Sequence, residues 1–481
     1  MIGKEKPPQK KFYYEGFSLD DRVRKDHPLR TIKKSIDFDF IYKEVEDKYG
    51  YNGNVSVPPS IILKLMFLLF YYDVSSEREL METVPERLDW LWFLGYDIDD
   101  KVPNHSVLSK ARKRWGTEVF KIFFVRVVGQ CVELGLVAGD KIFCDASLVD
   151  ADASCDSVRL NTGIEVIYDE FERRLDGDES AGCKKKYLSD TDSDAAVVRG
   201  RGGARPRYKE HRSVDGKFGV VTGVDVTSGD INEAHRLGVL KEEHELNTGC
   251  NVEAVVADSK YGTIENYLYC YDQGIKGHLP DIKDATSRSK RRKGIFSAEE
   301  FKYVVEEDVY ICPMGERLER KRYHKNRDSY DYCAAKEVCA VCRLRERCTR
   351  SKTGRSIKRH IRQDELDTMR REAKSMASRM DLKKRQHLNE RSFADAVNNH
   401  GFKRERWRRL WRVQIQDYMI AAIQNIRIMM KHGLKRVAVV SKRAQVEIDH
   451  LSSFIFASVT WFISGIFHFL SKMKNNTAHA T

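Results

Sequence analysis

One acidic residue inside a strand-forming run constrains this chain more than any other feature of its sequence. The run is KIFCDASLV, residues 141–149, and Asp145 lies at its centre. Short apolar runs of this kind are typical of β-strands. A carboxylate within a strand is costly unless a partner such as a metal ion compensates its charge. The run therefore predicts a strand that carries a functional site.

The stretch after this run alternates between strand-like and helix-like segments. Asp258 comes directly after the apolar run VEAVVAD, at the carboxyl end of a predicted strand, where open α/β sheets place their sites. This alternation predicts an α/β core that begins over residues 139–283. We expect strands at 141–149, 218–230, 252–258 and 275–280, helices at 231–246 and 264–274, and a long loop around one helix at 156–205.

A third acid, Glu390, lies in the predicted helix LKKRQHLNERSFADAV, within final core helices expected over 361–435. Three carboxylates that converge from two strands and a helix would hold two Mg²⁺ ions about 3.5–4 Å apart. Oxygen ligands suit this hard cation. The alternative is structural, because the chain has 72 acidic residues and most acids at strand ends are caps or turn residues.

The N-terminal part is polar over residues 1–30, which predicts a flexible arm, and helical in character over 31–138. Within it, a helix after VPNHS would carry a basic face. A short basic helix of this kind suits a helix-turn-helix contact with DNA, and the alternative is a solvated face on an ordinary bundle. The net charge of +13 favours a polyanionic partner. The basic residues of this helix are Lys110, Arg112, Lys113 and Arg114.

Residues 284–360 interrupt the core with a basic, cysteine-rich insertion. Cys312, Cys339, Cys342 and Cys348 follow the pattern C-x26-C-x2-C-x5-C, with Cys333 as an extra thiol and His324 as a weaker ligand candidate. A Cys-x2-Cys pair with two further cysteines suits a tetrahedral, structural Zn²⁺ site resembling a zinc ribbon. Free thiols that only pack are the alternative.

The two ends of the chain bear on its location. The first residues, MIGKEKPPQK, have no apolar signal region, and the eleven cysteines suit a reducing compartment, so we expect a cytoplasmic protein. The tail over 436–481 contains the uncharged stretch 451–470. That stretch is long enough to cross a bilayer, but its serines dilute its apolarity, so packing against the core is the favoured alternative to a membrane span.

Four passages resemble bacterial insertion-sequence transposases of the DDE type, in the branch with a cysteine-rich insertion. They run from DHPLR to PNHSVLSKARKRW, through FCDASLVDADAS, from YKEHRSVDGKFGVVTG to VVADSKYGTIEN, and along NERSFADAVNNHGFKRERWRRLW into the helix that follows. Together they span roughly residues 20–430 in the family's order. The resemblance implies an RNase H-like mixed sheet flanked by helices, with Asp145, Asp258 and Glu390 as its catalytic, metal-binding triad. It also implies cysteines at the four positions of the insertion.

The sequence departs from the family's pattern at two places. Many relatives have a basic residue seven positions after the glutamate, where this chain has Val397, although the basic residue five positions before it is present as Arg385. The usual glycine after the second aspartate is Ser259 here, with Tyr261 and Gly262 following. The absence of a basic residue at position 397 puts one contact with a DNA phosphate in doubt. Arginines later in the chain could supply the positive charge for that contact. These are Arg404, Arg406, Arg408 and Arg409.

The function expected from this resemblance is transposition of DNA. The chain would bind double-stranded DNA at the inverted repeats of its element and at the target, and act at the nucleoid. It would cut and join strands with Mg²⁺ or Mn²⁺, as a homodimer that pairs two ends. Two alternatives stand beside it: a non-catalytic DNA-binding protein with the same basic surfaces, and a metal nuclease without strand transfer.

Overall fold

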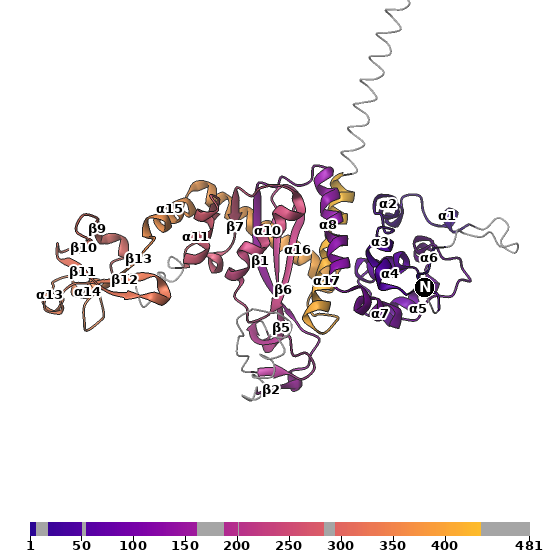
Figure 1. The fold of residues 1–481 in the computed structure, drawn as a ribbon, viewed down its shortest axis with the longest axis horizontal. Helices are drawn as coiled ribbons and strands as arrows, with labels where there is room; N and C mark the ends of the chain where they lie inside the picture. Colours follow the sequence, from indigo (N-terminus) through magenta and orange to yellow (C-terminus); the bar gives the residue numbers. More distant parts are fainter. Residues whose placement is uncertain (6–17, 51–53, 161–186, 201, 283–293, 434–481) are drawn as a thin grey trace, which may run out of the picture.

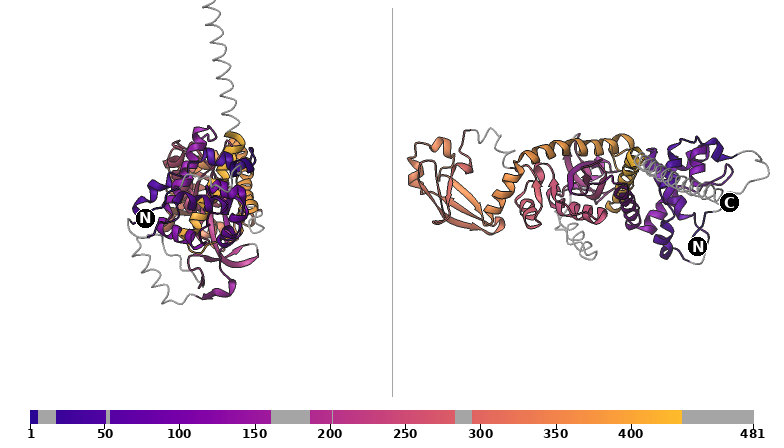
Figure 2. Two further views of the ribbon diagram at one scale, coloured as in Figure 1. Left: turned by 90° about the vertical axis from the view of Figure 1, so that its right-hand side faces the viewer. Right: turned by 90° about the horizontal axis from the view of Figure 1, so that it is seen from above.

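The computed structural model describes residues 1–5, 18–50, 54–160, 187–200, 202–282 and 294–433. Over these residues the molecule is elongated, with an N-terminal helical region at one end, a mixed sheet in the middle and the cysteine-rich insertion at the other end (Figures 1 and 2). The expected C-terminal tail with its apolar segment 451–470 lies outside the described residues. Among the described helices, none is both long enough and apolar enough to span a membrane.

The N-terminal region is built around one apolar helix, α4 (Pro59–Tyr71), which begins at a proline and is buried along nearly its whole length. Helices that are apolar on every side are typical of a protein interior. Helix α8 (Glu118–Glu133) leads from this region to the sheet. The other helices here are α1 (Leu19–Arg22), α2 (Pro28–Ser35), α3 (Ile41–Val45), α5 (Glu77–Thr83), α6 (Leu88–Leu94) and α7 (Ser106–Trp115).

The central sheet is mixed, so the α/β fold class is confirmed. Strand β1 is its middle strand, antiparallel to β5 on one side and parallel to β7 on the other. β8 pairs with β7 in parallel, while β4 and β6 pair with successive parts of β5. The strands are β1 (Lys141–Asp150), β4 (Ala196–Gly200), β5 (Gly203–Asp215), β6 (Val221–Ser228), β7 (Ala254–Val256) and β8 (Lys276–His278).

The segment between β1 and β5 differs from the expected loop. Its described residues form the short hairpin of β2 (Val158–Leu160) and β3 (Tyr187–Ser189) and the edge strand β4. The prediction of a loop was therefore wrong for these residues. It failed because a polar composition does not reveal strands that lie at an edge and pair mainly through their backbones.

Helices cover both faces of the sheet. α10 (Leu237–Thr248) and α11 (Ile264–Asp272) pack with Ile142 and Cys144 of β1 on one face. α16 (Met376–Asn399) and α17 (Leu410–Ile428) lie on the other face, on the side of Phe143. α17 also contacts α4 and α8, so the core of the sheet is continuous with that of the N-terminal region.

The insertion is a small antiparallel sheet with its own core. Its strand order is β13-β12-β11-β10-β9, and Phe301, Tyr310, Leu318, Tyr332 and Ile357 pack inside it. Two short helices, α13 (Lys336–Ala340) and α14 (Arg345–Cys348), carry cysteines. The strands are β9 (Lys302–Val304), β10 (Val309–Ile311), β11 (Arg317–His324), β12 (Ser329–Cys333) and β13 (Ser356–His360).

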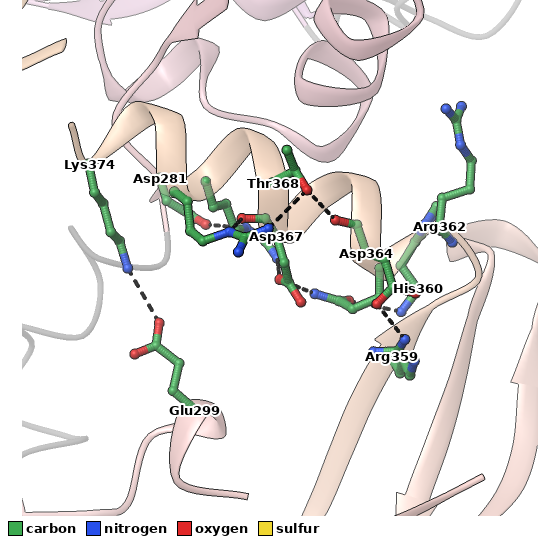
Figure 3. Close-up of polar contacts among 12 residues, drawn as sticks. Asp281, Glu299, Arg359, His360, Arg362, Asp364, Asp367, Thr368 and Lys374 are labelled. Carbon is green, nitrogen blue, oxygen red and sulfur yellow. Dashed lines mark hydrogen bonds and ion pairs between the residues drawn. The ribbon is translucent and has the colours of Figure 1, made fainter. Parts of the chain in front are cut away.

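Helix α15 (Gln363–Ala373) joins the insertion to the core through charged contacts (Figure 3). Arg359 of β13 contacts Asp364 at 2.9 Å, and Lys374 contacts Glu299 of the insertion at 3.3 Å. On the core side, Arg370 pairs with Asp281 at 2.7 Å. Ion pairs thus hold α15 to both the insertion and the core, and Leu366, Met369 and Ala373 pack the helix into the apolar core of the sheet domain.

Candidate functional site

Strands β1 and β7 place Asp145 and Asp258 side by side at one edge of the sheet. The two strands are parallel, with Phe143 opposite Val256. Continued by two residues, this register sets Asp145 opposite Asp258, whose backbone is still extended. Neighbouring strands lie about 4.8 Å apart. Asp258 is also among the charges that raise the pKa of Asp145, so the two carboxylates interact electrostatically.

Asp145 is held by a cation from the helix that covers this face. The guanidinium of Arg385, on α16, lies 3.0 Å from its carboxylate, and the backbone N–H of Ala146 donates to the same carboxylate at 2.9 Å. Burial raises the pKa of Asp145, and Arg385 only partly offsets this effect. The strand thus carries a partly buried carboxylate that gains from a nearby positive charge, as its sequence predicted.

Asp258 begins a tight turn. Its carboxylate accepts the N–H of Lys260 at 2.9 Å and caps the short 3-10 helix Ser259–Tyr261. Gly262 follows, where an added Cβ would lie 2.1 Å from the carbonyl oxygen of Pro280. The backbone at residue 262 therefore lies too close to Pro280 for any side chain. This close contact fixes the path that the chain takes after Asp258.

Two charged residues at this edge were missed by the sequence analysis. Glu233 follows β6, and its side chain is 5% exposed and forms an ion pair at 2.7 Å with Lys260, which is 64% exposed. Glu233 raises the pKa of Asp145, and Asp145 and Asp258 both raise that of Lys260. Four charges therefore share one site. The available signal was that β6 and β1 run in the same direction, so their carboxyl ends meet at one edge.

Glu390 lies on α16, five residues beyond Arg385. Its side chain is exposed, and its carboxylate accepts the side-chain amide of Gln386 at 3.1 Å. The structure thus brings Asp145 and Asp258 together and sets Arg385, not Glu390, against Asp145. Over the described part of the chain, no three His, Cys, Asp or Glu side chains are arranged so that they could hold one metal ion.

A buried polar cluster fixes α16 to the sheet beside the two aspartates. Arg212, on β5, is the cross-strand partner of Asp145, and its guanidinium donates to the Ser392 hydroxyl at 3.0 Å and to Gln424 at 2.8 Å. Glu405 and Asp417 lie in the same cluster, and their carboxylate oxygens have no hydrogen-bond partner among the described residues. Burial raises the pKa of both carboxyls, and Glu210 adds to the rise.

The four cysteines predicted as a set come together in the insertion. Burial raises the pKa of the Cys348 thiol, Arg355 lowers it, and Cys339, Cys312 and Cys342 raise it further. All four are half-buried, and no disulfide forms among the described cysteines. Of the two weaker candidates, Cys333 is at the end of β12, and His324 contacts Asp331 at 2.7 Å.

The predicted basic helix is α7, and its cations divide into two groups. Lys110, Lys113 and Arg114 are exposed. Arg112 is only 4% exposed, pairs with Glu77 and lies 3.8 Å above the ring of Trp407. Its guanidinium therefore joins parts of the protein interior and does not face solvent, which removes it from the set of candidate DNA contacts.

The segment 400–409, which we term the α16–α17 connection, carries the other predicted cations. Each arginine here pairs with an acid of another element. Arg404 and Arg408 contact Asp152, at 3.1 and 3.0 Å. The remaining pairs are Arg406 with Asp73 and Arg409 with Asp194.

Comparison with solved structures gives two transposase complexes. One is the piggyBac transposase synaptic complex with hairpin DNA, at 11% identity over 85% of this chain and 74% of that chain, with a TM-score of 0.34. The other is the Mos1 transposase paired-end complex with the left transposon end, at 11% identity over 50% of this chain and 64% of that chain, with a TM-score of 0.16. Curated proteins give no match.

Two domain families match the sequence itself. The family described as a transposase domain (DUF772) covers residues 17–114, the helical N-terminal region. The family described as a transposase DDE domain covers residues 311–430, from the insertion through α16 to α17. The two matches lie in separate parts of the chain and agree with each other, and together they support a DDE-type insertion-sequence transposase.

Proposed function

We propose that this transposase binds the terminal inverted repeats of its own element and catalyses metal-dependent DNA cleavage and strand transfer. The observation that carries the proposal is the pair Asp145 and Asp258, set opposite each other just beyond the point where the parallel pairing of β1 and β7 ends. Carboxylates in this position suit metal-assisted phosphoryl transfer.

The strand order supports an RNase H-like core. A meander of β1, β5 and β6 is followed by helix α10, the parallel strand β7, helix α11 and the parallel strand β8, with β1 between β5 and β7. The first aspartate is on the first strand, the second directly follows β7, and the glutamate is on the helix that crosses β1. These positions support the triad that we propose.

We assign Asp145, Asp258 and Glu390 to hold Mg²⁺ or Mn²⁺, which would polarise the reacting phosphate and activate the attacking hydroxyl. The residues fit a cation, because two carboxylates already share this edge and each faces a positively charged side chain, Arg385 or Lys260. Glu390 joins them when its exposed side chain leaves Gln386. Arg385 can then turn from Asp145 to a DNA phosphate.

For DNA binding, we propose the exposed cations of α7, namely Lys110, Lys113 and Arg114, together with Arg385. The pairing of two DNA ends requires two copies of the chain, so we propose a homodimer on paired ends. An enzyme of this kind would act on DNA in the cytoplasm.

We further propose that the four cysteines of the insertion hold a structural Zn²⁺. The thiols are half-buried, and the other three lie within electrostatic range of Cys348, although the four are not arranged around one ion in the described structure. Zinc prefers this donor set in tetrahedral sites, so the side chains would close around the ion when it binds. Metal analysis of the purified protein tests the assignment, with Cys333→Ser as the matched control for Cys342→Ser. Equal zinc content in both variants would overturn it.

The decisive experiment is cleavage of labelled DNA that carries the element's ends, with Mg²⁺ or with EDTA. We expect the wild type to nick the end in a metal-dependent way, Asp258→Asn to bind DNA without nicking it, and the exposed control Asp156→Asn to behave as the wild type. Binding without cleavage by the wild type in both Mg²⁺ and Mn²⁺ would overturn the enzyme and favour a non-catalytic DNA-binding protein. Cleavage without joined products would instead indicate a metal nuclease.

A further inference from the structure

The insertion carries a projecting hairpin whose cations face solvent. The end of β11, the turn Lys325–Arg327 and the start of β12 form this hairpin over residues 320–330, which we term the basic ribbon. β10 pairs only with Arg317–Glu319, so the basic ribbon extends beyond it and is flanked on one side by β13. Every residue from Glu319 to Tyr323 is exposed, unusual for a strand inside a five-stranded sheet.

Three cations at the end of the basic ribbon have no acidic partner among the described residues. These are Arg322, Lys325 and Arg327, all exposed. Nearer the base, Arg317 pairs with Glu307, and Arg320 pairs with Asp308 at 2.9 Å. Acids thus neutralise the base of β11 and leave its tip positively charged. Charges held at this spacing without internal partners are available for an external polyanion.

The frame of the basic ribbon is rigid enough to present these charges. The Tyr323 hydroxyl donates to Asp328 at 2.6 Å, and the rings of Tyr323 and Tyr330 pack 5.0 Å apart across the two strands. Ser329 pairs with His360 of β13, and the Asp328 carbonyl accepts the N–H of Ile361 at 2.8 Å. The tip is therefore fixed to β13, the strand that leads into α15, and Figure 3 shows the polar contacts where β13 meets α15.

This joint links the basic ribbon, through β13 and α15, to α11, the helix that follows Asp258. Glu265, in the first turn of α11, lies within electrostatic range of His360. Glu265 is seven residues after Asp258 in the sequence, so their Cα atoms are at most about 25 Å apart. One helical turn of DNA is about 34 Å long. A duplex held at Asp258 that extends toward α11 therefore covers the distance to Glu265 within its next turn, and Glu265 lies beside the strand that pairs with the basic ribbon.

We propose that the basic ribbon is a DNA-binding element that contacts the phosphates of the duplex held at the Asp145–Asp258 edge, through Arg322, Lys325 and Arg327. The proposal rests on the proposed function and adds a second, sequence-independent contact at the far end of the molecule from α7. A two-stranded ribbon fits the major groove of B-DNA, and Arg and Lys at its tip reach phosphate oxygens on either side.

The test measures DNA binding alone, in EDTA and in an Asp258→Asn background, so that it does not depend on cleavage. Binding of an element-end duplex and of a scrambled duplex of equal length is followed as a function of salt. Each phosphate contact contributes about 0.9 to the slope of log affinity against log salt. We expect Arg322→Ala/Lys325→Ala/Arg327→Ala to lower that slope by roughly 2.7 on both duplexes, and affinity at low salt to fall about tenfold or more.

The matched control exchanges the cations without removing charge: Arg322→Lys/Lys325→Arg/Arg327→Lys, which we expect to bind with the wild-type slope. Thermal melting checks that both triple variants fold as the parent does. An unchanged slope in the alanine variant would overturn the proposal, even if the protein cleaves DNA normally. A loss confined to the element-end duplex would also overturn it, since phosphate contacts do not distinguish sequences.

Discussion

Two arginine-rich segments of this transposase look alike as sequence and differ in what their charges meet. In the α16–α17 connection, residues 400–409, Arg404, Arg406, Arg408 and Arg409 each pair with an acid of another element. In the basic ribbon, residues 320–330, the tip cations have no acidic partner among the described residues. The first segment uses its charges to join the N-terminal region, the β1 end and the β4 edge, and the second presents them to solvent.

The difference teaches that a density of basic residues does not identify a DNA-binding surface. What separates the two cases is the position of the acids. The partner of Arg406, Asp73, lies 333 residues earlier in the chain, so no local sequence pattern indicates this ion pair. A cation that is already paired must break that pair before it binds a phosphate, whereas an unpaired cation contributes its full counterion release.

The largest effect is expected for Arg406→Ala. The Arg406 side chain is 11% exposed, binds Asp73 and the carbonyl oxygen of Val74, and lies over the ring of Phe70. Loss of these contacts should lower the free energy of unfolding by about 2–3 kcal/mol. Urea denaturation measures this change, with Arg406→Lys as the control. If the alanine variant were stable and its slope of log DNA affinity against log salt were reduced, Arg406 would be a DNA contact and not a structural residue, and the comparison would be reversed.

An intermediate effect is expected at Glu405, the buried acid of the same connection. Burial holds its pKa well above the ordinary value, so between those values the folded protein keeps the proton that the unfolded chain releases. Stability attributable to this carboxyl therefore falls as pH rises. Glu405→Gln removes this dependence and should stabilise the protein by about 1–3 kcal/mol at alkaline pH.

Melting temperatures of Glu405→Gln and the wild type at about pH 5 and about pH 8 test this sign. The advantage of the variant should grow with pH. An advantage that is equal at both values would show that the Glu405 carboxyl titrates in the folded protein as it does in the unfolded chain. The exposed Glu306→Gln, in the turn between β9 and β10, serves as the control.

A small effect on stability is expected for Arg404→Ala. Arg404 is 59% exposed and Asp152 is 33% exposed, and Asp152 keeps its contact with Arg408. Exposed ion pairs contribute about 0–1 kcal/mol. We expect a loss of less than about 0.5 kcal/mol and an unchanged salt slope for DNA binding. A slope reduced by about 0.9 would instead assign Arg404 to the DNA-binding surface.

The smallest effect on stability is expected for Arg322→Ala, which touches no acid among the described residues. Its free energy of unfolding should stay within about 0.5 kcal/mol of the wild type, while the salt slope of DNA binding falls by about 0.9. Measured together, Arg404→Ala and Arg322→Ala separate a paired from an unpaired arginine. If the two variants had the same slope of log DNA affinity against log salt, paired and unpaired arginines would not differ in DNA binding, and the comparison would fail.

Local signals in the sequence predicted the fold where the interactions are local. Alternation predicted β1, β7 and β8. Strand β5 was not predicted, because its centre is the charged run Lys209–Arg212. Only the tertiary structure shows that Glu210 and Arg212 are buried and that Arg212 finds partners on α16 and α17.

The candidate site was predictable to the same extent. Asp145 and Asp258 each follow from a strand pattern, and their adjacency follows from the parallel order of β1 and β7. Glu233 and Lys260 were missed because each lies outside a strand. Only the structure shows that they pair with each other beside Asp145 and Asp258. The orientation of Glu390 depends on how α16 rotates over the sheet, which periodicity does not fix.

The position of α17 in the chain has a consequence for when this protein can complete its fold. The helix packs against α4, α8 and β6, yet it is made after both aspartates, the insertion and α16. A ribosome that pauses within the insertion therefore carries a nascent chain whose central sheet still lacks both helices that cover one of its faces, α16 and α17. We expect the strands that carry the two aspartates to order only once synthesis has passed residue 428. An interrupted translation product would then be inert on DNA, a safeguard for a host genome against truncated copies.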